Sequence, residues 1–166
     1  MSNADYARRV ELLRSVSAGA ALLVAGLGAL VLLGWGLRFP LLTTFHPAFI
    51  SMKANTAAGF VLAGLALWLL QSQRAESRAA RYAAWAGAAL VAGLGVLTLA
   101  EYAGGWNLGI DQLLVREPAG ALRTVVPGRM APNTAFSFVL IGLGLLLLEV
   151  RTRGGPRPSA SWPPWR

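Results

Sequence analysis

The residues that could carry chemistry in this chain stand at the edges of long apolar runs. A Met-x-x-Asn-Thr-Ala pattern occurs twice, at Met52–Ala57 and Met130–Ala135, with a cation beside each copy. If each copy opens a helix, two positive helix ends and two cations could bind an anion or a lipid head group. Alternatively, Asn55 and Asn133, or the threonines that follow them, cap the two helix starts. The two interpretations are compatible.

Acidic residues mark a second group of candidates. Glu101 ends an apolar run, where we expect an ion pair with Arg129 or Lys53, and Asp111 is expected to lock a loop or start a short helix. The ligand-binding or coupling residues predicted from these patterns are Met52, Lys53, Asn55, Thr56, Glu101, Asp111, Gln112, Arg129, Met130, Asn133 and Thr134.

The composition excludes several kinds of reaction centre. The chain has no cysteine and one histidine, so it lacks thiolate and multi-histidine metal sites. It contains no phosphate-binding loop, zinc-protease motif or serine-hydrolase motif. We therefore predict neither catalytic nor metal-binding residues and no enzyme activity, and the sequence leaves any cofactor open.

The helices that would position these residues are predicted from the charge-free runs. Hydrophobic residues make up 55% of the 166 residues and charged residues 13%. Four runs of about 20 residues lack charge and show no alternation, which predicts an all-α membrane protein with four transmembrane helices. The expected spans are 15–37, 54–73, 82–100 and 130–148.

The distribution of basic residues predicts the orientation. Ten of the 15 lie on the side that carries both chain ends, which places both termini in the cytoplasm. The net charge of +8 then reflects topology and contact with anionic lipids, and it requires no nucleic acid. Residues 1–14 are the expected N-terminal segment, 15–150 the transmembrane domain and 151–166 a disordered tail. In the outer loop, 101–129, a short interfacial helix is expected.

The second and fourth runs resemble each other. Ser51–Leu70 and Arg129–Leu148 share 12 identical residues in 20 at an offset of 78. The first and third runs share Val-Ala-Gly-Leu-Gly at Val24–Gly28 and Val91–Gly95, a match that low complexity alone could produce. The longer match of the second and fourth runs predicts two copies of a helical hairpin with parallel topology. Small residues spaced four apart permit close packing, either within the chain or in a homodimer.

The motifs resemble a known family. Asn55–Ala57 (NTA), Gly105–Leu113 (GWNLGIDQL) and Gly128–Ala135 (GRMAPNTA) are similar to the four-helix N-terminal membrane sensor region of bacterial sensor histidine kinases and diguanylate cyclases. The resemblance covers about residues 15–150, with Asn107 where the family usually has Asp. It implies a bacterial inner membrane protein that lacks the cytoplasmic output domains of that family.

The predicted function is a membrane-embedded sensory or input module that signals to a cytoplasmic or membrane partner. One alternative is a small accessory subunit that binds lipid or pigment within a larger membrane complex. A small transporter or channel is less favoured, because the centres of the spans lack polar residues.

Overall fold

The structure is a computed structural model of the 166-residue chain. It describes residues 3–44, 51–71, 77–117 and 126–154, and the burial of side chains up to residue 148. The secondary structure of this part of the chain is entirely helical, with long helices α1, α3, α4 and α5 and short helices α2 and η2. Their bounds are α1 Asn3–Gly36, α2 Pro40–Thr43, α3 Ala54–Gln71, α4 Arg78–Gly104, η2 Ile110–Gln112 and α5 Pro132–Gly154.

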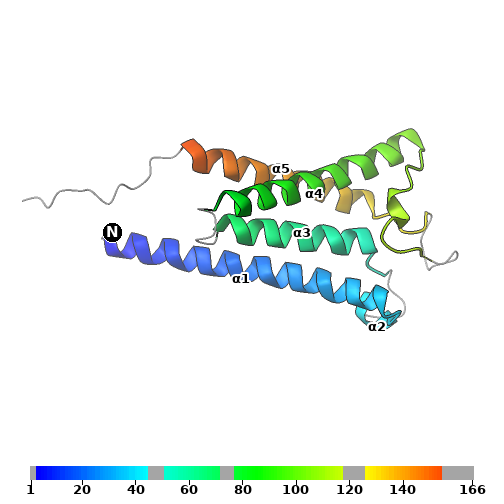
Figure 1. Cartoon of the computed structure of the whole chain (residues 1–166), viewed down its shortest axis with the longest axis horizontal. Helices are drawn as coiled ribbons and strands as arrows, with labels where there is room; N and C mark the ends of the chain where they lie inside the picture. The colour runs from blue at the N-terminus through cyan, green and yellow to red at the C-terminus, as the bar shows by residue number, and fades with distance from the viewer. Residues whose placement is uncertain (1–2, 45–50, 72–76, 118–125, 155–166) are drawn as a thin grey trace, which may run out of the picture.

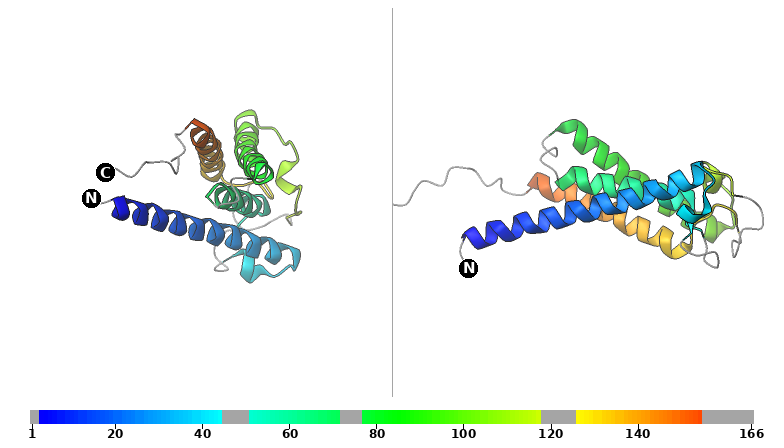
Figure 2. Two further views of the ribbon diagram at one scale, coloured as in Figure 1. Left: turned by 60° about the vertical axis from the view of Figure 1, so that its left-hand side comes forward. Right: turned by 90° about the horizontal axis from the view of Figure 1, so that it is seen from below.

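The long helices lie side by side along one axis (Figure 1). The segments that carry α2 and η2 lie at one end of the bundle, here called the loop end, and α1 begins and α5 ends toward the other (Figures 1 and 2). α1 packs on α3, α4 packs on α5, and α3 joins the two pairs mainly through α4. The fold thus consists of two helical hairpins that meet along α3.

Three of the described helices, α1, α3 and α4, are long and apolar enough to cross a membrane. In the most apolar part of α1 only 22% of the residues are buried, so most of its apolar side chains face outward. Lipid-facing helices are expected to expose such a surface, whereas a soluble monomer rarely exposes so much. The chain is therefore a helical multi-pass membrane protein.

The helix bounds differ from the expected spans in informative ways. α1 begins at Asn3, well before the expected start at 15, because charged residues can extend a helix beyond its apolar part. The apolar stretch of α5, Pro132–Leu148, is shorter than the three candidate spans. Where an interfacial helix was expected, the described part of residues 101–129 has the three-residue 3₁₀ turn η2 after α4, and Leu113 beside it is exposed. The tail beyond Gly154 lies outside the described residues.

Alanine and glycine form the contact surfaces within each hairpin. A Cβ atom on Gly28 of α1 would approach the Ala57 carbonyl oxygen of α3 to 2.5 Å. A Cβ atom on Gly95 of α4 would likewise overlap the Ala135 carbonyl oxygen of α5. Because neither position has room for a side chain, the backbones of each pair approach closely.

The two hairpins also correspond at a second contact further along the helices. Gly64 of α3 packs against Ala25 of α1, and Gly142 of α5 packs against Ala92 of α4. These contacts recur at the offsets of 67 and 78 residues that relate the runs in the sequence. The two hairpins are therefore packed internally in the same way.

One aromatic contact fills the space between the hairpins. The buried Phe138 ring of α5 lies where a Cβ atom on Gly59 of α3 would be. The same ring meets Phe60 edge to face, with centroids 5.5 Å apart. This arrangement is a favourable one for aromatic pairs and anchors α5 against α3.

Candidate functional site

Five charged residues at the loop end form one buried group, here called the polar cluster. Its side chains come from the segment before α3, the last turn of α4, the connection that follows, and the segment before α5. None of the five residues is more than 9% exposed. The members of the polar cluster are Lys53, Glu101, Asp111, Glu117 and Arg129.

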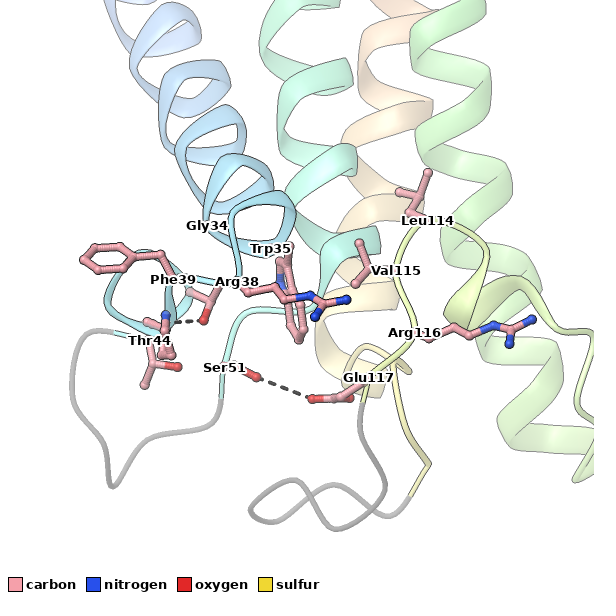
Figure 3. A pocket seen from close by; sticks show the side chains of 12 residues that line it. Gly34, Trp35, Arg38, Phe39, Thr44, Ser51, Leu114, Val115, Arg116 and Glu117 are labelled. Carbon is pink, nitrogen blue, oxygen red and sulfur yellow. Dashed lines mark hydrogen bonds between the residues drawn. The ribbon is translucent and has the colours of Figure 1, made fainter.

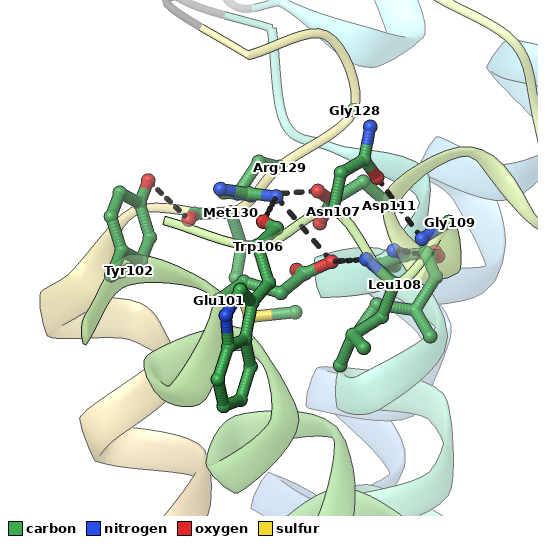
Figure 4. Close-up of polar contacts among 12 residues, drawn as sticks. Glu101, Tyr102, Trp106, Asn107, Leu108, Gly109, Asp111, Gly128, Arg129 and Met130 are labelled. Carbon is green, nitrogen blue, oxygen red and sulfur yellow. Dashed lines mark hydrogen bonds and ion pairs between the residues drawn. The ribbon is translucent and has the colours of Figure 1, made fainter. Parts of the chain in front are cut away.

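Arg129 is the centre of one half of the polar cluster (Figure 4). Its Nε donates a hydrogen bond of 2.7 Å to Asp111 Oδ2, and a terminal guanidinium nitrogen lies 3.4 Å from Glu101 Oε1. The expected pairing of Glu101 with a cation is confirmed, with Arg129 as its partner. Asp111 lies in η2, so its bond ties the connection to the segment before α5 and locks this loop, as expected.

Uncharged groups complete this half. The Arg129 guanidinium donates to the Trp106 carbonyl oxygen at 3.1 Å and lies 5.4 Å from the centre of the Tyr102 ring. The Leu108 backbone N–H donates to Glu101 Oε1 at 2.7 Å. The end of α4, the chain that follows it and the start of α5 are therefore fixed to one another.

The other half of the polar cluster joins the two hairpins. Lys53, just before α3, donates to both carboxylate oxygens of Glu117, at 2.5 and 2.7 Å. The Gly128 backbone N–H donates to Glu117 Oε2 at 2.6 Å. Since Lys53 belongs to the first hairpin and Glu117 to the second, this ion pair crosses between them.

Gly128 holds the halves in contact. Its φ of +78° lies in the left-handed region, and a Cβ atom there would overlap the Asp111 carbonyl oxygen. The same Cβ atom would lie 3.0 Å from Cγ of Gln112, whose side chain is otherwise exposed. Glycine is therefore required where the chain passes between Glu117 and η2.

The polar cluster contains one more carboxylate than cation. Two of its oxygens, Glu101 Oε2 and Asp111 Oδ1, are buried and have no hydrogen-bond partner among the described residues. Buried polar atoms without partners are unfavourable. Within the described residues, no group of His, Cys, Asp or Glu is arranged to hold a metal ion.

The two Asn-Thr-Ala copies have different surroundings. The side chain of Asn55 is buried and donates from Nδ2 to the Ile110 carbonyl oxygen at 2.8 Å, which adds a second link between the hairpins. Thr56 is also buried, whereas Asn133 is exposed and Thr134 half-buried. α3 and α5 each begin one residue before the asparagine, so both asparagines lie inside the first helical turn instead of at the capping position.

The two methionines of the pattern accept hydrogen bonds through their backbone carbonyl oxygens. Trp35 Nε1 at the end of α1 donates to the Met52 carbonyl oxygen at 2.9 Å. Tyr102 Oη near the end of α4 donates to the Met130 carbonyl oxygen at 3.1 Å. Trp35 and Tyr102 are 67 positions apart and the two methionines 78. The two hydrogen bonds are therefore related by the same offsets as the glycine contacts.

The structure brings together Lys53, Glu101, Asp111 and Arg129, but as mutually neutralising groups. Both cations bind carboxylates, so the polar cluster does not offer them to an outside anion. Sequence reasoning missed Glu117, which pairs with a residue 64 positions away. Its signal would have been its rarity, since the whole chain has only seven acidic residues.

No protein-family model, curated protein or solved structure matches the chain. The function therefore has to be argued from the geometry of this site and the arrangement of the helices around it.

Proposed function

We propose that the chain is a membrane-embedded input module of bacterial signal transduction, with four transmembrane helices and both termini in the cytoplasm. The observation that carries the proposal is the Lys53–Glu117 ion pair, buried between the two hairpins. A buried ion pair adds little stability compared with apolar packing of the same volume. Such a pair is better explained as part of a contact that has two states.

The proposed orientation puts the polar cluster at the periplasmic side. The basic residues near the chain ends face the cytoplasm under the positive-inside rule, and the loop end lies opposite to them (Figure 1). A cue from outside the cell, or from the outer leaflet, would reach the polar cluster first. The output would be a change in helix positions at the cytoplasmic side, read by a signalling partner.

The route between the two ends consists of rigid helices. α3 begins beside Lys53 and α4 ends near Glu101, and both helices run to the opposite end of the bundle. Their neighbours contact them through glycine and alanine, which have no side-chain rotamers to change. A shift at the loop end would therefore move whole helices against one another.

We further infer that the two hairpins are copies of one unit. The inference is supported by 12 identities in 20, by the Trp35 and Tyr102 bonds, and by the paired contacts of Gly28 and Gly95. The polar cluster itself is not duplicated, because Ala131 stands at the position equivalent to Lys53. This asymmetry supports a coupling role for the contact between the copies.

The test measures whether the loop end controls the opposite end. The chain has no cysteine, so spin labels can be placed at Arg14→Cys in α1 and Arg78→Cys in α4 without background labelling. Lys53→Met breaks the ion pair between the hairpins, and Arg116→Gln is the control because Arg116 has no ion pair among the described residues. The measurement is the distance distribution by pulsed electron resonance in lipid nanodiscs.

We expect Lys53→Met to shift or broaden the distribution and Arg116→Gln to leave it unchanged. Circular dichroism and gel filtration establish that both variants remain folded. A folded Lys53→Met variant with an unchanged distribution would overturn the proposal, because the ion pair would then not influence the cytoplasmic end.

A further inference from the structure

A cavity of about 740 Å³ lies at the loop end, beside the polar cluster (Figure 3). One wall is formed by the end of α1 and by α2, and the other by the segment Leu114–Glu117. The volume is within the range of small-molecule sites. The cavity is therefore large enough for a head group or a short apolar chain.

The lining combines apolar walls with unpaired cations. Trp35, Phe39 and Leu114 supply apolar surface, and Arg38 supplies positive charge. Arg116 also lines the cavity, but its side chain points away from the wall formed by α1 (Figure 3). Figure 3 shows the Arg38 side chain reaching from α1 toward the opposite wall. Such a lining suits a ligand that has both an anionic and an apolar part.

The ion pairs at the loop end do not include Arg38 or Arg116. The described carboxylates at this end are Glu101, Asp111 and Glu117, and Lys53 and Arg129 bind them. Glu117 also lines the cavity, but Lys53 and the Gly128 N–H occupy its oxygens. Arg38 and Arg116 form no ion pair within the described residues, so their positive charge is available to a ligand.

The backbone at Arg38 is an independent observation. The Phe39 N–H donates to the Gly34 carbonyl oxygen at 2.8 Å and the Arg38 N–H to Trp35 at 3.3 Å, which ends α1 in a Schellman motif. Arg38 has φ +54°, the left-handed position usually taken by glycine. Gly105, 67 residues later, has φ +64° just past the end of α4.

At the equivalent position the second hairpin thus has glycine, which adopts a positive φ without strain, whereas the first hairpin has an arginine. A residue held in an unfavourable backbone conformation points to a function of its side chain. At Arg38 that side chain extends along the cavity beside Trp35 (Figure 3). The strain and the cavity therefore indicate the same residue.

We infer that this cavity binds an anionic phosphate group that carries an apolar chain, with Arg38 as its ligand. The planar guanidinium of Arg38 can donate two parallel hydrogen bonds to phosphate oxygens. Leu37 and Leu41 next to the cavity are 72% and 71% exposed, which suits an opening toward lipid. The site does not depend on the signalling role proposed above.

The experiment is native mass spectrometry of the full chain in mild detergent, titrated with phosphatidylglycerol or phosphatidylcholine. Arg38→Gln/Arg116→Gln removes the proposed ligand together with the other arginine of the lining. Arg9→Gln/Arg14→Gln is the matched control, because it removes the same charge from exposed positions of α1 far from the cavity. Isothermal titration with inorganic phosphate forms a second arm and distinguishes a soluble phosphate from a lipid.

We expect one phosphatidylglycerol per chain, bound at least tenfold more weakly by Arg38→Gln/Arg116→Gln and less than twofold more weakly by the control. Arg38→Gly is expected to lose binding without a lower melting temperature, since glycine suits this backbone. Saturable binding of inorganic phosphate alone, lost in the same double variant, would assign the site to a soluble phosphate. Equal losses in both double variants, equal binding of both lipids, or no saturable binding of any ligand would overturn the inference.

Discussion

Replacement of Arg129 with methionine tests most directly how much the ion pairs of the polar cluster contribute to stability. The side chain is only 9% exposed, and it pairs with Asp111 at 2.7 Å and Glu101 at 3.4 Å. Methionine keeps much of the volume but leaves both carboxylates without a cation. Breaking a buried ion pair from one side costs about 3–5 kcal/mol, because the remaining charge stays buried.

The expected effect is large enough for a simple assay. For a chain of this size, 1 kcal/mol corresponds to a shift of about 2–4 °C in melting temperature. Arg129→Met should therefore lower the melting temperature by about 6–20 °C, measured by circular dichroism in mild detergent. Arg116→Met is the control, because an exposed residue outside such a network changes stability by about 0.5 kcal/mol or less.

Neutralising the carboxylates should repair the damage. With Glu101→Gln and Asp111→Asn added to Arg129→Met, no net charge remains buried at this half of the polar cluster. We expect the triple variant to be more stable than Arg129→Met alone. The buried ion pairs would not stabilise the fold as described if Arg129→Met melts within a few degrees of Arg116→Met, or if the triple variant is no more stable than the single one.

Two glycine pairs provide matched predictions about close packing, each checked by the free energy of unfolding. Gly128→Ala should cost about 1–3 kcal/mol more than Gly105→Ala, since both have positive φ but only Gly128 is pressed against the backbone of η2. Equal losses would mean that η2 moves aside freely. Gly95→Ala should cost about 1–3 kcal/mol through overlap with the backbone of α5. Gly93→Ala, which meets no atom within 4 Å, should be neutral or stabilising, and a loss there equal to that at Gly95 would contradict the packing argument.

The helical class of the fold could be predicted because it depends on local properties. Long charge-free runs require helices in lipid, and α1, α3 and α4 contain the first three predicted spans almost completely. Helix ends were less accurate, since α1 continues through Arg8, Arg9 and Arg14 to Asn3. Hydropathy marks the apolar part of a helix, whereas a charged sequence can extend the same hydrogen-bonded backbone.

The candidate site was only partly accessible to sequence reasoning. Glu101, Asp111 and Arg129 were recognised individually because charges at the edge of apolar runs are rare. Glu117 was not, because only the folding of the connection brings it to Lys53. The two Asn-Thr-Ala copies read alike, yet only Asn55 is buried, since Asn133 lies on the outer side of α5.

The sequence by itself determined the helical membrane class and the spacing of the small residues, both of which follow from the transfer of apolar side chains into lipid and from the helical period. The tertiary structure decided which charges neutralise one another. Ion pairing depends on distances between residues far apart in the chain, such as Lys53 and Glu117. That pairing leaves Arg38 and Arg116 without acidic partners in the described chain and places them on a cavity that no local pattern predicts.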